Sequence, residues 1–262
     1  MQPETLIGIY AFCLGAFIGS FLNVLIYRLP RSEDFVFGRS HCPHCGLLIR
    51  WYDNIPLLSY IILLGKCRKC RRHISWRYPL VELLTAAFFL VVFLLYGISY
   101  QSLVAIVFFA LLLVITFIDF KYYIIPDKIT YPGMVLGLAL SFVNPLISPL
   151  ESLVGLLAGG LTLYLLAILG DYFLKKESLG GGDIKLAAVL GAFLGWKNLF
   201  LIFFAAAVFG LIYAVLRMVI ARQSAAGRMI PFGPFLSLAG LLALFFGNLL
   251  VDYYVSQFLA LN

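Results

Sequence analysis

Charged residues are scarce in this chain. Only 12% of its 262 residues are Asp, Glu, Lys or Arg, whereas 63% are hydrophobic. Soluble proteins average about 25% charged residues and about 45–50% apolar residues. The composition therefore excludes a disordered chain and a coiled coil, and five cysteines in a chain of this length exclude a small disulfide-stapled secreted module.

The hydrophobic residues come in long blocks. A helix that crosses the hydrocarbon core needs about 20 apolar residues, and several stretches approach that length. We predict an all-α polytopic membrane protein with about eight transmembrane helices. The expected spans are residues 6–27, 79–96, 103–118, 131–147, 153–170, 186–196, 199–216 and 231–250. The sixth, with 11 residues, crosses only if its helix extends back into the preceding glycines; otherwise it is re-entrant.

Basic residues set the expected orientation. Ten of the 19 Lys and Arg residues lie between Arg28 and Arg77, a segment with only three acids. Cytoplasmic segments of membrane proteins carry an excess of Lys and Arg, so this segment is expected to face the cytoplasm, with the N-terminus outside. Eight crossings then place 18 of the 19 basic residues on the cytoplasmic side, with Lys197 as the exception. Topology thus explains the positive charge, and no nucleic-acid partner is expected.

Three parts are predicted along the chain. Residues 1–27 form a first span, expected to be retained because the block lacks the basic start and small-residue cleavage site of a signal peptide. Residues 28–78 form a small cytoplasmic domain inserted after that span, and residues 79–262 form a helical membrane domain. The sequence contains no low-complexity stretch and no convincing internal repeat.

Four cysteines of the inserted domain form two C-x-x-C pairs, Cys42 with Cys45 and Cys67 with Cys70. Two such pairs offer four thiolates, a ligand set that suits tetrahedral zinc. The domain has few large apolar residues for a core of its own, so a metal would supply folding energy. We predict structural zinc; unrelated thiols or an oxidised pair are the alternative, although a reducing cytoplasm disfavours disulfides.

Asp119 and Asp183 stand at the ends of the third and sixth predicted spans, on the same face of the membrane. Asp183 closes a Gly-Gly-Gly-Asp run, which lets the backbone come close to a neighbour. A carboxylate at the edge of the hydrocarbon is costly and is usually paired or functional. Two facing carboxylates share a proton, so that one activates a water and the other polarises a carbonyl, as in aspartic proteases. The alternative is that each aspartate is only a polar stop signal.

An ordered set of motifs runs through nearly the whole chain. They are Gly19–Val24 with Arg28–Pro30, the two C-x-x-C pairs with Asn54–Pro56 between them, Tyr78–Glu82, Ile118-Asp119 followed by Ile125–Asp127, the G-x-G-D run ending at Asp183, and Pro231–Pro234. In these motifs the chain resembles the type IV prepilin peptidases, a family of bifunctional leader peptidases and N-methyltransferases.

The resemblance implies that Asp119 and Asp183 are the catalytic pair of an aspartic peptidase in the bacterial inner membrane. Its substrates would be prepilins or pseudopilins, cut at the cytoplasmic face after a short basic leader. The new N-terminal residue would then be methylated with S-adenosylmethionine as the donor. In the family the cysteine domain is linked to bifunctional members, so its presence favours both activities.

The methyl-transfer site is not assigned by the sequence. There is no Gly-rich fingerprint of a Rossmann-type methyltransferase, so the donor site is expected in the loop 28–78 and the nearby helix ends. Glu82 is a candidate for binding the substrate amine or the donor. A partner role for Arg77 or Arg72 at the interface is an equal alternative.

Three acids near the predicted active face, Asp127, Asp171 and Glu177, are candidates for attracting the positive charge of the leader. This hypothesis depends only on their expected place at the cytoplasmic face. Reversing their charge is expected to raise the apparent Michaelis constant.

Other functions stay open at this point. One alternative is a peptidase without methyltransferase activity, in which the cysteine loop is purely structural. Another is a membrane scaffold or transporter, although transport predicts acids near the midplane and here they sit mostly at span ends. A presenilin-like protease shares G-x-G-D but leaves the cysteine domain unexplained.

Overall fold

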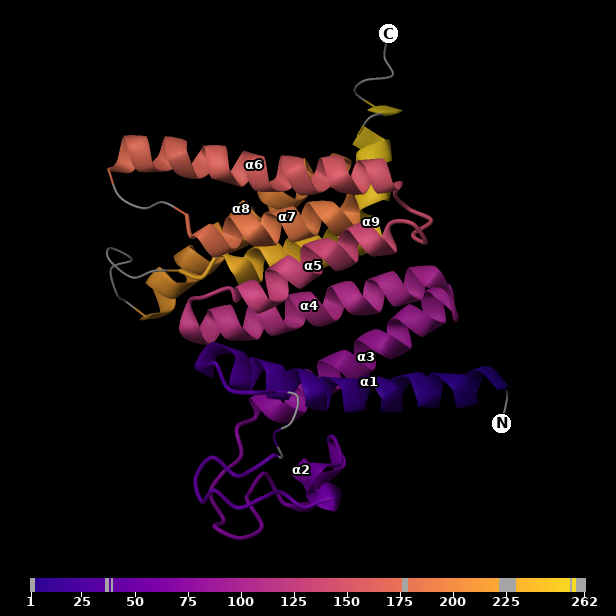
Figure 1. The fold of residues 1–262 in the computed structure, drawn as a ribbon, viewed down its shortest axis with the longest axis vertical. Coiled ribbons are helices and arrows are strands. Elements are labelled where there is room, and N and C mark those ends of the chain that lie inside the picture. The colour runs from indigo at the N-terminus through magenta and orange to yellow at the C-terminus, as the bar shows by residue number, and fades with distance from the viewer. Residues whose placement is uncertain are drawn as a thin grey trace. The chain divides into compact units, whose positions relative to one another are not determined.

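The computed structural model describes residues 3–35, 38, 40–175, 179–221, 230–254 and 256–257. Over these residues the chain is helical (Figure 1), and its extended pairings are two isolated bridges, His41 with Leu48 and Lys66 with His73. The chain divides into two compact units, Met1–Ile106 and Val107–Asn262, and helix α4 contributes to both. The all-α prediction is confirmed.

The first unit is built on two packed helices, α1 (Pro3–Arg28) and α3 (Arg77–Tyr96). Small residues let their backbones approach: a Cβ at Gly15 would lie 2.8 Å from the Cα of Ala86, and one at Gly19 would lie 2.7 Å from the Cα of Glu82. Such close crossings are typical of helices in membranes. The polar segment between these helices carries η1 (Leu29–Arg31), η2 (Trp51–Asn54) and α2 (Leu58–Ile62).

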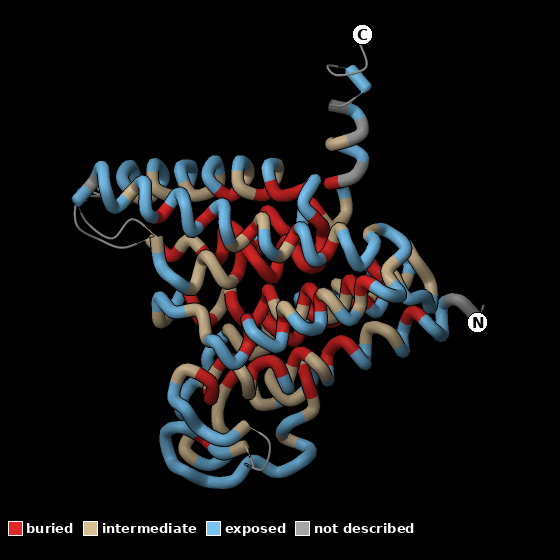
Figure 2. The backbone as a smooth tube through the Cα atoms, turned by 45° about the horizontal axis from the view of Figure 1, so that its top comes forward, coloured by how far each residue is buried: buried red, intermediate tan, exposed pale blue. Residues whose placement is uncertain are grey.

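The second unit surrounds one short helix. Its elements are the remainder of α4 (Tyr100–Tyr122), α5 (Asp127–Leu140), α6 (Pro149–Leu174), α7 (Gly181–Leu194), η3 (Trp196–Asn198), α8 (Leu199–Ala221) and α9 (Gly233–Tyr254). Every residue of α7 from Leu186 to Leu194 is buried, because α5, α6 and α9 pack around it. Figure 2 shows buried residues where helices pack and exposed residues along the outer faces. Large apolar side chains on those outer faces suit contact with lipid.

Helices α6 and α7 are in unusually close contact. A Cβ at Gly155 would lie 2.2 Å from the carbonyl oxygen of Gly191, and a Cβ at Gly159 would lie 2.3 Å from that of Ala187. The buried Ser152 hydroxyl donates a hydrogen bond to the Ala192 carbonyl at 2.6 Å. Because backbone faces backbone, this pair fixes where α7 sits within its unit.

Substituting Gly155 with alanine is therefore expected to destabilise the protein by about 1–3 kcal/mol, since overpacking forces the backbones apart. Gly210→Ala in α8 is the matched control, because its Cβ would meet only Phe235, at an ordinary 3.6 Å. There the helix propensity of alanine should leave stability unchanged or slightly higher. Thermal unfolding in detergent checks both variants, and equal melting temperatures would contradict the packing argument.

The eight predicted spans each coincide with a helix, but most boundaries differ by several residues, and two of these differences bear on the short helices. The expected span 131–147 is observed as α5, which begins four residues earlier, accommodates Pro132 and ends at Leu140. The expected span 186–196 is observed as α7, which does extend back into the glycine run and ends where Gly195 adopts φ 74°. Both helices begin with a polar or glycine-rich turn, which an apolar run does not include.

Five helices are long and apolar enough to cross a membrane. They cover Thr5–Arg31, Arg77–Tyr96, Tyr100–Tyr122, Pro149–Phe173 and Trp196–Ile220, and Gly233–Gly247 is a shorter apolar helix. Helices α5 and α7 have 14 residues each, about 21 Å at 1.5 Å per residue. The chain is thus a membrane protein, and eight crossings remain a prediction.

Candidate functional site

Asp119 lies in the last turn of α4, with only 5% of its surface exposed. The backbone N–H of Gly233, the first residue of α9, donates a hydrogen bond to its Oδ2 at 3.1 Å. A Cβ at Gly233 would lie 2.7 Å from that oxygen, so only glycine permits this approach. The positive end of the α9 dipole thus faces the Asp119 carboxylate.

Asp183 lies in the first turn of α7, where Gly180 is the N-cap and accepts the Asp183 N–H at 3.0 Å. Its side chain is half-buried, and its carboxylate is close enough to that of Asp119 for an electrostatic interaction. The fold therefore brings together two carboxylates that are 64 positions apart in the sequence. Two such groups cannot both be ionised cheaply, which is the electrostatic condition for acid–base catalysis by a carboxyl pair.

The loop between α4 and α5 packs against the segments that carry the two aspartates. Tyr123, at φ 57°, ends α4 and donates its N–H to the Asp119 carbonyl at 2.9 Å. Ile125 then reaches both neighbours, because a Cβ at Gly182 would lie 2.8 Å from the Ile125 Cβ and one at Gly233 would lie 3.0 Å from its Cδ1. The sequence analysis gave Ile125 and Gly233 no role, although both lie in motifs it had singled out.

Of the three acids expected to attract a basic leader, Asp127 already has a partner. Its Oδ1 accepts from the Lys185 ammonium at 2.6 Å, which ties the start of α5 to the first turn of α7 two residues after Asp183. Asp171 is exposed on α6, and Glu177 lies outside the described residues. Because an ion pair offsets its charge, Asp127 is better placed to position α7 than to bind a distant cation.

The four cysteines of the inserted domain come together, as predicted. The Sγ atoms of Cys42, Cys45, Cys67 and Cys70 all lie within 4.8 Å of one another, and those of Cys42 and Cys70 are 3.9 Å apart. Tetrahedral zinc with bonds of about 2.3 Å requires sulfur–sulfur distances of about 3.8 Å. The cluster therefore fits a structural zinc ion.

The two cysteine pairs are built by the same turn, a repeat that the sequence analysis missed. Cys42 N–H bonds to the Leu47 carbonyl and Cys67 N–H to the Arg72 carbonyl, both at 2.9 Å. The isolated bridges of His41 with Leu48 and of Lys66 with His73 lie beside these bonds, and they too are related by a shift of 25 positions. Ile49 and Ile74 repeat the next contact, bonding to Ser40 and Gly65. Each pair thus forms a knuckle of the same backbone geometry.

The thiols of the second knuckle differ in acidity. Backbone N–H groups of Cys70 and Lys69 hydrogen-bond to Cys67 and lower the pKa of that thiol to about 7. At Cys70 the hydrogen bond from the Arg72 backbone acts in the same direction, but desolvation and the neighbouring thiols outweigh it and raise the pKa to about 11. Clustered thiols cannot all ionise without a cation, which a divalent metal would provide.

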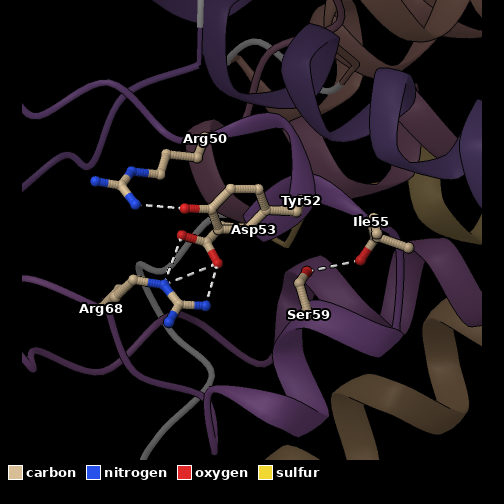
Figure 3. A network of polar contacts seen from close by, with 6 residues as sticks. All are labelled: Arg50, Tyr52, Asp53, Ile55, Ser59 and Arg68. Atoms are coloured by element: carbon tan, nitrogen blue, oxygen red, sulfur yellow. Dashed lines mark hydrogen bonds and ion pairs between the residues drawn. The ribbon is translucent and has the colours of Figure 1, made fainter.

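A polar network supports the second knuckle (Figure 3). Arg68, which lies between its two cysteines, donates from Nε and Nη2 to the Asp53 carboxylate at 2.6–3.0 Å. Arg50 bonds to the Tyr52 hydroxyl, and the Ser59 hydroxyl to the Ile55 carbonyl. Of these contacts, the charge-assisted pair of Arg68 with Asp53 joins the cysteine turn to the loop between the knuckles.

Glu82 makes neither of the expected ion pairs with Arg77 or Arg72. Among the described residues it has no cationic partner; its Oε2 accepts the backbone N–H of Leu57 at 2.8 Å instead. The Arg77 guanidinium lies over the ring of Tyr78, at 4.9 Å from its centroid. The interface-partner alternative for Glu82 is therefore wrong.

These features define the class: an all-helical membrane protein that combines a four-cysteine cluster with a pair of neighbouring carboxylates. Residues 13–96 match the model of the bacterial peptidase A24 N-terminal domain, and residues 106–215 match the type IV leader peptidase family.

Several curated relatives carry the name prepilin leader peptidase/N-methyltransferase. The protein of Aeromonas hydrophila is 35% identical over 95% of this chain and 93% of its own length, and that of Pseudomonas putida is 36% identical over 95% and 93%. The protein of Myxococcus xanthus is 40% identical over 80% of this chain, which spans only 63% of that relative. No solved structure matches the chain. The chain belongs to the type IV leader peptidase family, and the resemblance drawn from its motifs is confirmed.

Proposed function

We propose that the protein removes the leader peptide of type IV prepilins and pseudopilins by an aspartic mechanism and then methylates the new N-terminus. The relatives named above carry both activities in their names. The observation that supports the peptidase half is the juxtaposition of Asp119 and Asp183 in one unit, with the Gly233 N–H on Asp119.

The chemistry follows from the two environments. The N–H of Gly233 favours negative charge on Asp119, so we assign Asp119 as the base that takes a proton from the attacking water. Asp183, beside that charge, keeps its proton and donates it toward the scissile carbonyl. Water attack then gives a tetrahedral intermediate. Asp119 returns the proton to the nitrogen of the scissile bond, so that the C–N bond breaks and the leader separates from the mature chain with its new amino terminus.

The inserted domain is assigned to the methyl-transfer half. Cys42, Cys45, Cys67 and Cys70 would hold a structural zinc ion that folds this domain. S-adenosylmethionine would supply the methyl group when bound, and no residue is assigned here as its holder. In this proposal the cysteine domain and the aspartate pair both face the cytoplasm at the bacterial inner membrane. The basic leader of the substrate would remain in the cytoplasm, outside the bilayer.

Both activities are tested on one product. Wild-type protein in detergent is incubated with a prepilin, and the mature chain is examined by mass spectrometry with and without S-adenosylmethionine. We expect leader loss in both samples and a gain of one methyl group only with the donor. Cleavage without methylation would support the peptidase-only alternative, and no cleavage would favour the scaffold or transporter.

Lys185→Glu is expected to slow cleavage by about two- to fivefold, because an exposed ion pair is worth at most about 1 kcal/mol. The loss should appear in kcat, since the pair with Asp127 positions the turn that carries Asp183. The double charge reversal, Asp127→Lys with Lys185→Asp, should restore the rate. Lys197→Glu breaks a similarly exposed pair with Glu151 beyond the other end of α7 and should leave kcat unchanged. If Lys185→Glu changed KM rather than kcat, and the double charge reversal did not restore the wild-type value, direct binding of the leader by Asp127 would be favoured instead.

A further inference from the structure

We infer that Glu82 and Asn23 form a binding site for a primary ammonium group, the free N-terminus of the cleaved substrate. This inference deepens the proposed function and rests on it. The sequence left Glu82 as a candidate for either the substrate amine or the methyl donor and gave Asn23 no role, and the relatives' names assign neither residue to a ligand.

Glu82 is a carboxylate in an apolar helix with 8% of its surface exposed. It accepts hydrogen bonds from the Leu57 N–H and from the Ser20 hydroxyl, and no cation balances it among the described residues. An acid at such a position is costly and usually serves a ligand or a proton. A carboxylate has about four acceptor positions. Two neutral donors therefore leave its charge unbalanced and about two acceptor positions unused.

Asn23 supplies a second acceptor. It is 2% exposed, its Nδ2 donates to the Tyr78 carbonyl at 3.0 Å, and its Oδ1 has no hydrogen-bond partner. A buried acceptor without a partner is unusual in a native structure and calls for a missing donor. The asparagine thus presents an unused oxygen inside the helix pair.

The two acceptors lie at neighbouring turns of the α1–α3 contact. Gly19 of α1 packs on Glu82 of α3. One turn further along, Asn23 of α1 donates a hydrogen bond to the carbonyl of Tyr78, which precedes Glu82 by four residues. Residues spaced by four share one face of a helix. Glu82 and Asn23 therefore lie about one helical turn apart along the same α1–α3 contact.

The chemistry of this pair points to an ammonium group. A primary ammonium has one positive charge and three donors, which suits a carboxylate and an amide oxygen together. The site lies where α1 and α3 meet the polar segment, and Leu57, held by Glu82, adopts φ 61°, ψ −50°. An apolar chain can lie along the exposed faces of these helices while its charged end enters the polar turn. A strained residue at such a place is typical of a functional site.

The test is a binding measurement without any methyl donor. A fluorescent apolar peptide that begins with phenylalanine, with a free or an acetylated N-terminus, is titrated with the full-length protein in detergent. Wild type is expected to bind the free peptide about tenfold more tightly, since a charge-assisted hydrogen bond is lost on acetylation. Glu82→Gln should abolish this preference and leave the acetylated peptide unaffected, while Glu82→Asp should retain part of it. Glu33→Gln, an exposed acid of the same unit, is the matched control.

Leader cleavage by the same preparations separates the two claims. If wild type cleaves prepilin but binds both peptides equally, the inference is overturned and the proposed function stands. A preference that survives Glu82→Gln also overturns it, as does displacement of the free peptide by S-adenosylmethionine, which would assign the site to the donor. If Glu82→Gln does not fold, the inference is tested by the preference of the wild type for the free over the acetylated peptide and by the reduced preference of Glu82→Asp. Absence of cleavage by wild type would instead refute the proposed function.

Discussion

Replacing Asp119 or Asp183 with asparagine is expected to reduce prepilin cleavage by at least about 10³-fold. Asparagine keeps the size and the hydrogen bond from Gly233 but cannot accept a proton at position 119 or supply one at position 183. Acid–base groups contribute about 10²–10⁴-fold each, and a carboxyl pair loses its function when either member is removed. The initial rate of leader release, followed by mass spectrometry, measures the loss.

Glu151→Gln is the matched control for these variants. It also exchanges a carboxylate for an amide in the second unit, and glutamine can preserve the capping box that Glu151 forms with Ser148 at the start of α6. Its cleavage rate should equal that of wild type. Thermal unfolding in detergent must show that the two aspartate variants remain folded, because a misfolded protein would lose activity for another reason.

The second large effect is expected at the four-cysteine cluster. Cys67→Ser should reduce bound zinc from about one ion per chain to near zero and unfold the inserted domain, because the binding free energy of a structural zinc is also folding free energy, about 10–16 kcal/mol in small domains. Residues around the knuckles should then become sensitive to proteolysis. Methyl transfer should be lost, whereas the aspartate pair of the other unit should still cleave.

Elemental analysis and limited proteolysis check this prediction. Cys13→Ser is the control, since Cys13 is an exposed thiol of α1 that lies outside the cluster. It should retain both zinc and protease resistance. A wild-type protein without zinc, or a Cys67→Ser variant with full zinc content, would contradict the assignment of the cluster as a metal site.

Much of the architecture could be predicted from local signals. Apolar runs located the eight helices of 14 residues or more, although not all of these runs had membrane length, and two C-x-x-C pairs predicted the sulfur cluster, because a tight turn alone sets the spacing of each pair. The limits of α5 and α7 were less predictable. Their first turns are polar or glycine-rich, so an apolar run does not mark where these helices begin.

The contacts that complete the sites depend on residues far apart in the sequence. Gly233 donates to Asp119 across 114 positions, and Glu82 holds Leu57 across 25. Gly233 lies in a motif whose role was unassigned, and the Leu57 contact of Glu82 stands where an arginine partner had been one of two equal alternatives. Nothing in local composition encodes such pairings, because they arise only when helices pack. The repeat of the two knuckles was in principle visible, since Ile49 and Trp51 recur as Ile74 and Trp76.

The most direct test of the central claim is a double-mutant comparison of Asp119→Asn, Asp183→Asn and the combined variant in one cleavage assay. The account predicts that each single variant falls to the same residual rate and that the double variant is no slower, because the two carboxyl groups act as one unit. Cleavage by either folded single variant at more than about a tenth of the wild-type rate, or losses that multiply in the double variant, would contradict it.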